Sequence, residues 1–145
     1  MSPRADVVAA AREMHRLGLV AGTTGNVSAR EGDLIHITPS ALPYPEMTED
    51  DLVTLDADGA VVAGEREPSS ERRVHLAVYA ARPDARAIVH THSGYATAWT
   101  FVDEPLVSAD LVRIAGGSVR TAPYAASGSE AIAVAAVEAI GGRQA

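Results

Sequence analysis

Two histidines separated by one residue, His90 and His92, end a short apolar run. In a β-strand, residues two apart point to the same face, so both imidazoles are expected to lie side by side at a separation suited to one tetrahedral metal ion, for which zinc is the natural candidate. Histidines at this spacing also pack or hydrogen-bond without a metal, and a catalytic zinc site uses three protein ligands. The remaining histidines, His15, His36 and His75, are each more typical of helix-surface or core positions. The pair therefore indicates zinc only if a further ligand joins it.

The segment 68–71, Pro-Ser-Ser-Glu, precedes an expected helix. Serines at this place satisfy free backbone N–H groups, and an early glutamate complements the helix dipole, which alone explains the pattern. The same N–H groups, together with the hydroxyls of Ser69 and Ser70, can instead bind a phosphate, with Glu71 placed nearby as a base. The segment thus predicts either a helix cap or an anion site that has an adjacent base.

A glycine-containing turn, 22–26 (Gly-Thr-Thr-Gly-Asn), and the segment 38–41 (Thr-Pro-Ser-Ala) offer further polar groups. Glycine and asparagine tolerate positive φ, so the first segment is by composition an ordinary turn. It is neither a Walker loop nor the G-x-G-x-x-G dinucleotide fingerprint. Its N–H groups can nevertheless form an anion nest, and the second segment adds two hydroxyls at the end of an expected hairpin.

Hydrophobic periodicity predicts the elements that position these residues. We expect helices over 6–20, 71–81, 95–102, 110–115 and 130–140, and strands over 27–30, 34–38, 52–56, 60–62 and 87–92, with a possible further strand over 119–121. Turns at 31–33 and 57–59 join the first four strands into two antiparallel hairpins, and the strand over 87–92 is expected to be buried. Gly22 is expected to cap the first helix, and 127–130 (Ser-Gly-Ser-Glu) matches a capping box. This order predicts an α/β fold whose mixed sheet is covered by helices on both faces.

Composition excludes several classes of protein. The 145 residues are 47% hydrophobic and 21% charged, and no apolar stretch approaches the ~20 residues of a membrane-spanning helix, so one globular domain is expected. A net charge of −7 disfavours nucleic acid as a partner. Cysteine is absent, which removes disulfides and thiolate sites, and the N-terminus has no apolar signal region. We therefore expect a cytoplasmic protein with neither a nucleic-acid nor a membrane partner.

Taken together and in order, the motifs between residues 22 and 93 resemble a known family. Gly-Thr-Thr-Gly-Asn-Val-Ser-Ala-Arg, Ile-Thr-Pro-Ser, Pro-Ser-Ser-Glu and Val-His-Thr-His-Ser are similar to the class II aldolase/adducin family, with the nearest pattern among its L-fuculose-phosphate aldolases. The segments 115–117 and 122–125 also lie where family members carry similar sequence, so the resemblance covers nearly the whole chain. It implies a three-layer αβα fold around a mainly antiparallel or mixed sheet, and a homotetramer with active sites between subunits.

The resemblance also implies the roles of individual residues. It implies a zinc ion held by His90, His92 and a third histidine further on, with Glu71 as the acid/base. The substrate phosphate is expected at Gly25, Asn26, Ser40, Ser69 and Ser70. In the family the third histidine follows the last helix. We therefore expect residues 1–145 to form a single class II aldolase/adducin domain that lacks its C-terminal portion.

The activity implied is metal-dependent cleavage of a phosphorylated ketose, such as L-fuculose 1-phosphate, to dihydroxyacetone phosphate and an aldehyde. Because the chain contains no lysine, a Schiff base is not available, and zinc is expected to stabilise the electrons left on carbon. Two departures keep alternatives open. Ala41 stands where glycine is frequent, and 108–111 lacks the tyrosine that the family's aldolases carry near this place. It has Asp110 instead, in a region where related pentulose-phosphate 4-epimerases place an aspartate. Such an epimerase, a sugar-acid phosphate decarboxylase and a non-catalytic adducin-like module are the alternatives.

Overall fold

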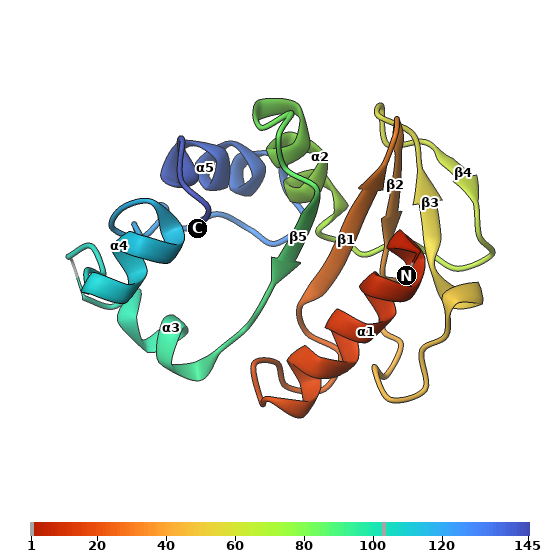
Figure 1. The fold of residues 1–145 in the computed structure, drawn as a ribbon, viewed down its shortest axis with the longest axis horizontal. Coiled ribbons are helices and arrows are strands. Elements are labelled where there is room, and N and C mark those ends of the chain that lie inside the picture. The colour runs from red at the N-terminus through yellow and green to blue at the C-terminus, as the bar shows by residue number, and fades with distance from the viewer. Residues whose placement is uncertain (1, 103) are drawn as a thin grey trace.

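The computed structural model describes residues 2–102 and 104–145 (Figure 1). Its helices are α1 (Pro3–Arg16), the 3₁₀ helix η1 (Glu49–Asp51), α2 (Arg72–Ala81), α3 (Gly94–Trp99), α4 (Ala109–Ala115) and α5 (Glu130–Ile140). Its strands are β1 (Asn26–Glu31), β2 (Leu34–Ile37), β3 (Val53–Leu55), β4 (Val61–Ala63) and β5 (Ala87–His90). The possible strand over 119–121 is wrong, because Val119 forms only an isolated bridge with Leu106.

The five strands form one sheet in the order β4-β3-β2-β1-β5. The two predicted hairpins, β1–β2 and β3–β4, are confirmed, and all four pairings that the structure describes are antiparallel rather than mixed. The strand β5 pairs with β1 so that His90 lies opposite Asn26. This register brings the first predicted metal ligand beside the glycine-containing turn.

The first helix ends earlier than predicted. It stops at Arg16, and Gly18 then adopts a left-handed φ of +67°. The N–H groups of Gly18 and Leu19 bond back to carbonyls of the last helical turn at 3.0 and 3.1 Å, which is a Schellman motif. Gly22 therefore does not cap the helix, because Gly18 reaches a position suited to glycine first.

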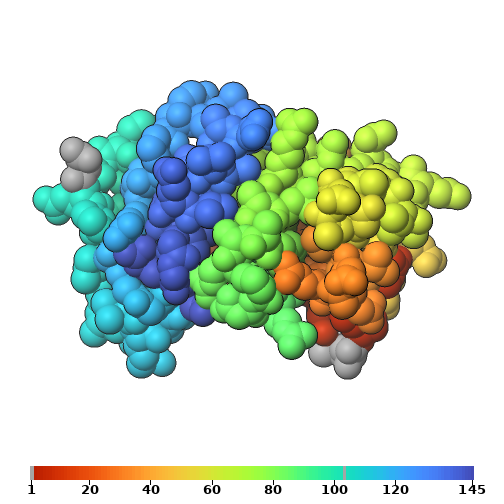
Figure 2. Space-filling model, turned by 90° about the horizontal axis from the view of Figure 1, so that it is seen from above, coloured from red at the N-terminus to blue at the C-terminus, as the bar shows by residue number. Residues whose placement is uncertain are grey.

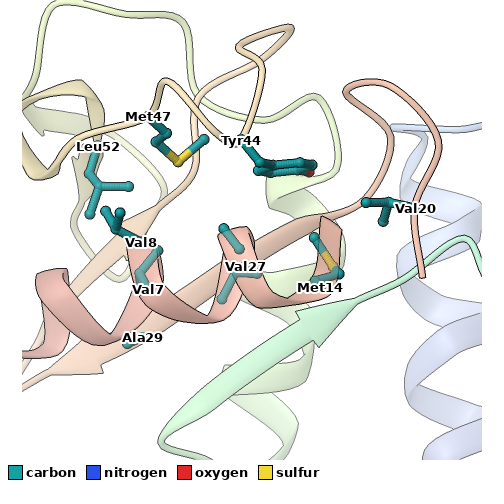
Figure 3. Close-up of a cluster of buried hydrophobic side chains, with 10 residues drawn as sticks. Val7, Val8, Met14, Val20, Val27, Ala29, Tyr44, Met47 and Leu52 are labelled. Atoms are coloured by element: carbon teal, nitrogen blue, oxygen red, sulfur yellow. The ribbon is translucent and has the colours of Figure 1, made fainter. Parts of the chain in front are cut away.

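Two buried apolar clusters lie on opposite faces of the sheet. Side chains of α1 pack against β1 and the loop that follows β2, as Figure 3 shows; this cluster is Val7, Val8, Ala11, Met14, Val20, Val27, Ala29, Tyr44, Met47 and Leu52. The other cluster joins Tyr79 of α2 to side chains of β2 and β3, namely Ile35, Ile37, Val53 and Leu55. Because successive strand residues point to opposite faces, α1 covers one face and α2 the other.

The C-terminal third of the chain lies beyond α2. The helices α2 and α5 pack against each other, and Figure 2 shows the segment around α2 between the C-terminal third and the N-terminal sheet. Three aromatic side chains of this third are largely exposed: Tyr95 (93%), Phe101 (88%) and Tyr124 (98%). Within the described residues, no helix has both the length and the apolar character needed to cross a bilayer.

Candidate active site

The two histidines of the His-Thr-His motif lie together, although not in the way predicted. Strand β5 ends at His90, so His92 lies beyond the strand, where its N–H donates to the carbonyl of Leu19 at 2.9 Å. The imidazole centroids are 4.9 Å apart, with the rings tilted by 41°. The strand is also not buried as predicted, because it forms an edge of the sheet and its residues alternate between exposed and half-buried. The loop after α1, rather than strand geometry, therefore places the second ring.

Asn26 connects this pair to the interior. Its side chain is buried, and its Oδ1 lies 3.3 Å from Nδ1 of His90 and 2.5 Å from Nε2 of His75. A carbonyl oxygen can only accept hydrogen bonds, so both imidazole nitrogens donate to it. The side chain of Asn26 thus faces two histidines, while the predicted phosphate contact of its backbone N–H stays a prediction.

His75 is fully buried and hydrogen-bonded at both ring nitrogens. Its Nδ1 lies 2.6 Å from Oγ of Ser28, which in turn lies 2.8 Å from the hydroxyl of Tyr79. Burial, and to a lesser extent the neighbouring His90, lower the pKa of His75 to about 3. His75 is therefore neutral and links the interior to Asn26, a role that its sequence position did not indicate.

The stability of the chain should depend on the protonation of His75. Its pKa is about 3 when folded and about 6.5 when unfolded, so between these values the unfolded state binds the proton more readily. Below about pH 6.5, the contribution of His75 to the free energy of unfolding should therefore fall by up to ~1.4 kcal/mol for each pH unit. The total loss between neutral pH and pH 5 should be ~2 kcal/mol. Urea unfolding of the wild type and His75→Gln from pH 7.5 to 5 tests this. Equal slopes in both proteins would contradict it.

Glu71 occupies the N-cap position of α2 and is 7% exposed. Its Oε1 accepts a hydrogen bond from the hydroxyl of Ser127, whereas its Oε2 is buried and has no hydrogen-bond partner among the described residues. Glu71 and His90 line the same groove, about 430 Å³ in volume, with apolar side chains of α2, β5 and α5. Burial and His92 lower the pKa of His90, and the charge of Glu71 opposes them. Glu71, one of whose carboxylate oxygens has no hydrogen-bond partner among the described residues, thus lines the same cavity as His90.

Ser127 is a site residue that the sequence analysis assigned to a helix cap. The capping residue of α5 is Ser129, whose Oγ accepts the N–H of Ile132 at 3.2 Å. Ser127 is left free to donate to Glu71, which is 56 residues away in sequence. The Ser-Gly-Ser pattern indicated that one serine is available for another contact, because only one of the two serines can occupy the N-cap of α5.

The loop before α5 is held against the start of α2. Gly128 has φ +70°, and a Cβ there would lie 2.9 Å from the carbonyl oxygen of Ser70. The guanidinium of Arg73 donates to the Gly128 carbonyl at 2.9 Å. These contacts keep Ser127 close to the carboxylate of Glu71.

The segments 38–40 and 67–70, which carry three of the predicted phosphate-binding serines, lie side by side. Two backbone hydrogen bonds join them, from the N–H of Ser40 at 2.9 Å and from the N–H of Ser69 at 3.1 Å. Ser40 and Ser70 are exposed, whereas Ser69 is buried and its Oγ accepts the N–H two residues later at 3.2 Å. The fold thus brings these serines near one another, and their binding of phosphate stays a prediction.

Two backbone positions near these segments adopt left-handed conformations. Gly25 has φ +77°, and a Cβ there would lie 2.7 Å from the carbonyl oxygen of His90, so the turn fits closely against the end of β5. Ala41 has φ +56° and is the only non-glycine residue with positive φ in the described part of the chain. Glycine is preferred in this conformation, which agrees with the expectation from the resemblance that glycine is frequent at this place.

The residues present match part of a zinc shell. Zinc accepts imidazole nitrogens and carboxylate oxygens, and the site provides two adjacent imidazoles and a buried carboxylate oxygen without a partner. Across residues 2–102 and 104–145, however, no group of three or more histidine, aspartate or glutamate side chains is placed to hold a metal ion. A complete shell therefore requires at least one ligand in addition to His90 and His92.

A family model for the class II aldolase and adducin N-terminal domain matches residues 5–145. The chain belongs to this family. It is 44% identical to a 5-deoxy-D-ribulose 1-phosphate aldolase of Bacillus thuringiensis, across 98% of this chain and 68% of that protein. It is 49% identical to an L-ribulose-5-phosphate 4-epimerase of Salmonella paratyphi B, across 60% of this chain and 39% of that protein.

A solved structure of an L-fuculose 1-phosphate aldolase superposes with a TM-score of 0.92 and 38% identity. The match covers 98% of this chain and 68% of that structure. The resemblance inferred from the motifs is thus confirmed, and the fold is that of class II aldolases, with helices around an antiparallel sheet. The relatives include both aldolases and an epimerase, so the family alone does not fix the substrate.

Proposed function

We propose that the protein containing this chain is a zinc-dependent aldehyde-lyase that cleaves a ketose 1-phosphate to dihydroxyacetone phosphate and an aldehyde. The observation that carries the proposal is Glu71, which lines the same groove as His90 and has a buried carboxylate oxygen, Oε2, without a hydrogen-bond partner among the described residues. Related proteins named as aldolases of L-fuculose phosphate and 5-deoxyribulose phosphate support this class of substrate.

Each residue has a role in this proposal. His90 and His92 hold zinc, which when bound supplies a Lewis acid at the carbonyl of the substrate. When the carbon–carbon bond breaks, its electron pair stays on the carbon nearer the phosphate. The hydroxyl on the other carbon gives up its proton to water and becomes the carbonyl of the aldehyde, which leaves. Glu71 delivers a proton to that carbon through Oε2, and Ser127 holds the other carboxylate oxygen. The chain has no lysine with which to form a Schiff base, which favours this route.

Ser70→Ala should raise the KM for a phosphorylated ketose about tenfold and leave kcat unchanged. The exposed hydroxyl of Ser70 is proposed to donate to phosphate, and a hydrogen bond to a charged group contributes ~1.5–3 kcal/mol. Steady-state kinetics with the sugar phosphate and with the unphosphorylated sugar provide the test, since the variant should not affect the second substrate. An unchanged KM for the phosphorylated sugar would remove Ser70 from the site.

The proposed phosphate donors are all neutral, namely Gly25, Asn26, Ser40, Ser69 and Ser70. Ionic strength screens interactions between charged groups more strongly than hydrogen bonds from neutral donors. We therefore expect the KM to change by less than about twofold between low and physiological salt. A steep rise of KM with salt would indicate that arginines hold the phosphate instead.

A 4-epimerase of a pentulose phosphate is the second candidate. Asp110 in the first turn of α4 favours it, because its carboxylate is exposed and its only ion pair among the described residues is with Arg113, at 3.4 Å. A related L-ribulose-5-phosphate 4-epimerase also favours it. A panel of sugar phosphates and sugar-acid phosphates separates the candidates, because an aldolase releases dihydroxyacetone phosphate, an epimerase releases an uncleaved epimer and a decarboxylase releases carbon dioxide. A non-catalytic adducin-like module would turn over none of them.

We further propose that the complete subunit has a three-layer αβα arrangement and assembles as a homotetramer. The exposed aromatic side chains of Tyr95, Phe101 and Tyr124 support an interface in the C-terminal third, because aromatic residues are enriched in protein–protein interfaces.

A further inference from the structure

We propose that a buried hydrogen-bond chain, which runs from Tyr79 through Ser28, His75 and Asn26, fixes the tautomer of His90. Its members come from two elements, with Ser28 and Asn26 on β1 and the other two on α2. His75 and Ser28 are thus positioning residues that act on a candidate metal ligand through Asn26. Only one part of this proposal rests on the proposed function, namely that the unprotonated nitrogen of His90 binds zinc.

The direction of every hydrogen bond in this chain follows from the chemistry of Asn26. Its Oδ1 only accepts, so Nε2 of His75, at 2.5 Å, carries a hydrogen. A neutral imidazole has one N–H, which leaves Nδ1 of His75 as an acceptor for the Ser28 hydroxyl at 2.6 Å. Because the hydrogen of Ser28 is then used, its oxygen accepts from the hydroxyl of Tyr79 at 2.8 Å.

The same reasoning determines the state of His90. Its Nδ1 lies 3.3 Å from Oδ1 of Asn26 and must donate. In the neutral ring, Nε2 then has no hydrogen and presents a lone pair. Histidines that bind metals usually donate their other N–H to a carbonyl or carboxylate oxygen, which fixes the tautomer and the ring orientation. Asn26 meets this requirement with a side-chain carbonyl.

The hydrogen-bond chain is shielded from water, and Arg30 contacts its end at Tyr79. Ser28 and His75 are 0% exposed, and Asn26 and Tyr79 are nearly as buried. The guanidinium of Arg30 lies 4.6 Å from the centroid of the Tyr79 ring and also donates to the Tyr79 carbonyl at 2.7 Å. Loss of one member would leave a buried polar atom unpaired, so the members are expected to act as a unit.

NMR of imidazole nitrogens in the metal-free chain at pH 7.5 tests the proposal directly. Long-range proton–nitrogen spectra distinguish a protonated ring nitrogen from one with a free lone pair. We expect His75 to be protonated at Nε2 and His90 at Nδ1, with each ring in a single tautomer. His90 protonated at Nε2, or present as a mixture of tautomers, would overturn the proposal. Single-histidine variants assign the signals, and His36→Gln is the control because His36 is buried and hydrogen-bonded outside this chain.

Ser28 variants test whether a change at Ser28 alters the tautomer of His90 through the hydrogen-bond chain. Ser28→Ala removes the donor to His75, so both rings should become tautomer mixtures, and zinc added alone should bind up to about tenfold more weakly. Ser28→Thr keeps the hydroxyl and should restore both readouts. An unchanged single tautomer of His90 in Ser28→Ala would overturn the proposal. If Ser28→Ala does not fold, the tautomers of His75 and His90 in the wild-type spectrum are sufficient to test the proposal.

The two proposals fail separately. If the wild-type tautomers are as expected but the protein containing this chain does not bind zinc, the proposed function is contradicted and the fixed tautomer stands. If zinc binds while His90 is protonated at Nε2 in the metal-free chain, the zinc site stands and the role of the buried chain is overturned.

Discussion

Replacing both His90 and His92 with alanine should lower the rate of dihydroxyacetone phosphate release by at least ~10³-fold. These rings are the two proposed nitrogen ligands, which the structure places together, and the metal is proposed to stabilise developing charge by several kcal/mol. The same variant should lose the zinc bound to the wild type. Steady-state kinetics together with elemental analysis of the purified protein measure both effects.

His15→Ala is the matched control for this variant, because His15 is an exposed histidine of α1. It should retain both zinc and activity. A double variant that retains wild-type zinc and turnover would show that the two histidines only pack against each other.

Glu71→Gln should lower kcat by about 10²-fold while the zinc content stays near that of the wild type. Glutamine keeps the volume of the buried side chain and can still accept a hydrogen bond from Ser127, but it cannot deliver a proton through the position of Oε2. Initial rates at saturating substrate, measured with zinc content, separate a loss of proton transfer from a loss of metal.

Glu67→Gln is the control for Glu71, because it makes the same chemical change at an exposed glutamate in the preceding loop. It should have wild-type kinetics. An unchanged kcat in Glu71→Gln would remove this residue from the proposed mechanism.

Regular local patterns made much of the fold predictable. The apolar period of α2 and the turns at 31–33 and 57–59 depend on near neighbours in sequence, so both hairpins and the helix over 72–81 agree with the sequence prediction to within a residue or two. Element ends were less predictable. Leu17 continues the apolar period of α1 yet is exposed, because the helix ends at Arg16 and the chain turns away at Gly18.

The site was predictable in its residue types and not in its long-range contacts. The spacing of His90 and His92 indicated a pair, but the second ring is placed by Leu19, from a loop that no local pattern connects to it. His75 has an ordinary helical position in the sequence, and its link to Ser28 across 47 residues exists only in the folded chain. Contacts of this kind depend on how α2 is positioned relative to β1, which hydrophobic periodicity does not specify.

We propose that this chain contributes the metal and acid/base residues of a zinc-dependent aldolase. Dihydroxyacetone phosphate release from 5-deoxyribulose 1-phosphate and L-fuculose 1-phosphate, assayed as purified, after chelation and after zinc is restored, tests it most directly. We predict cleavage of at least one substrate that stops on chelation and returns with zinc. Cleavage that continues undiminished in the chelated protein, or no cleavage of either substrate by the zinc-loaded protein, would contradict the account.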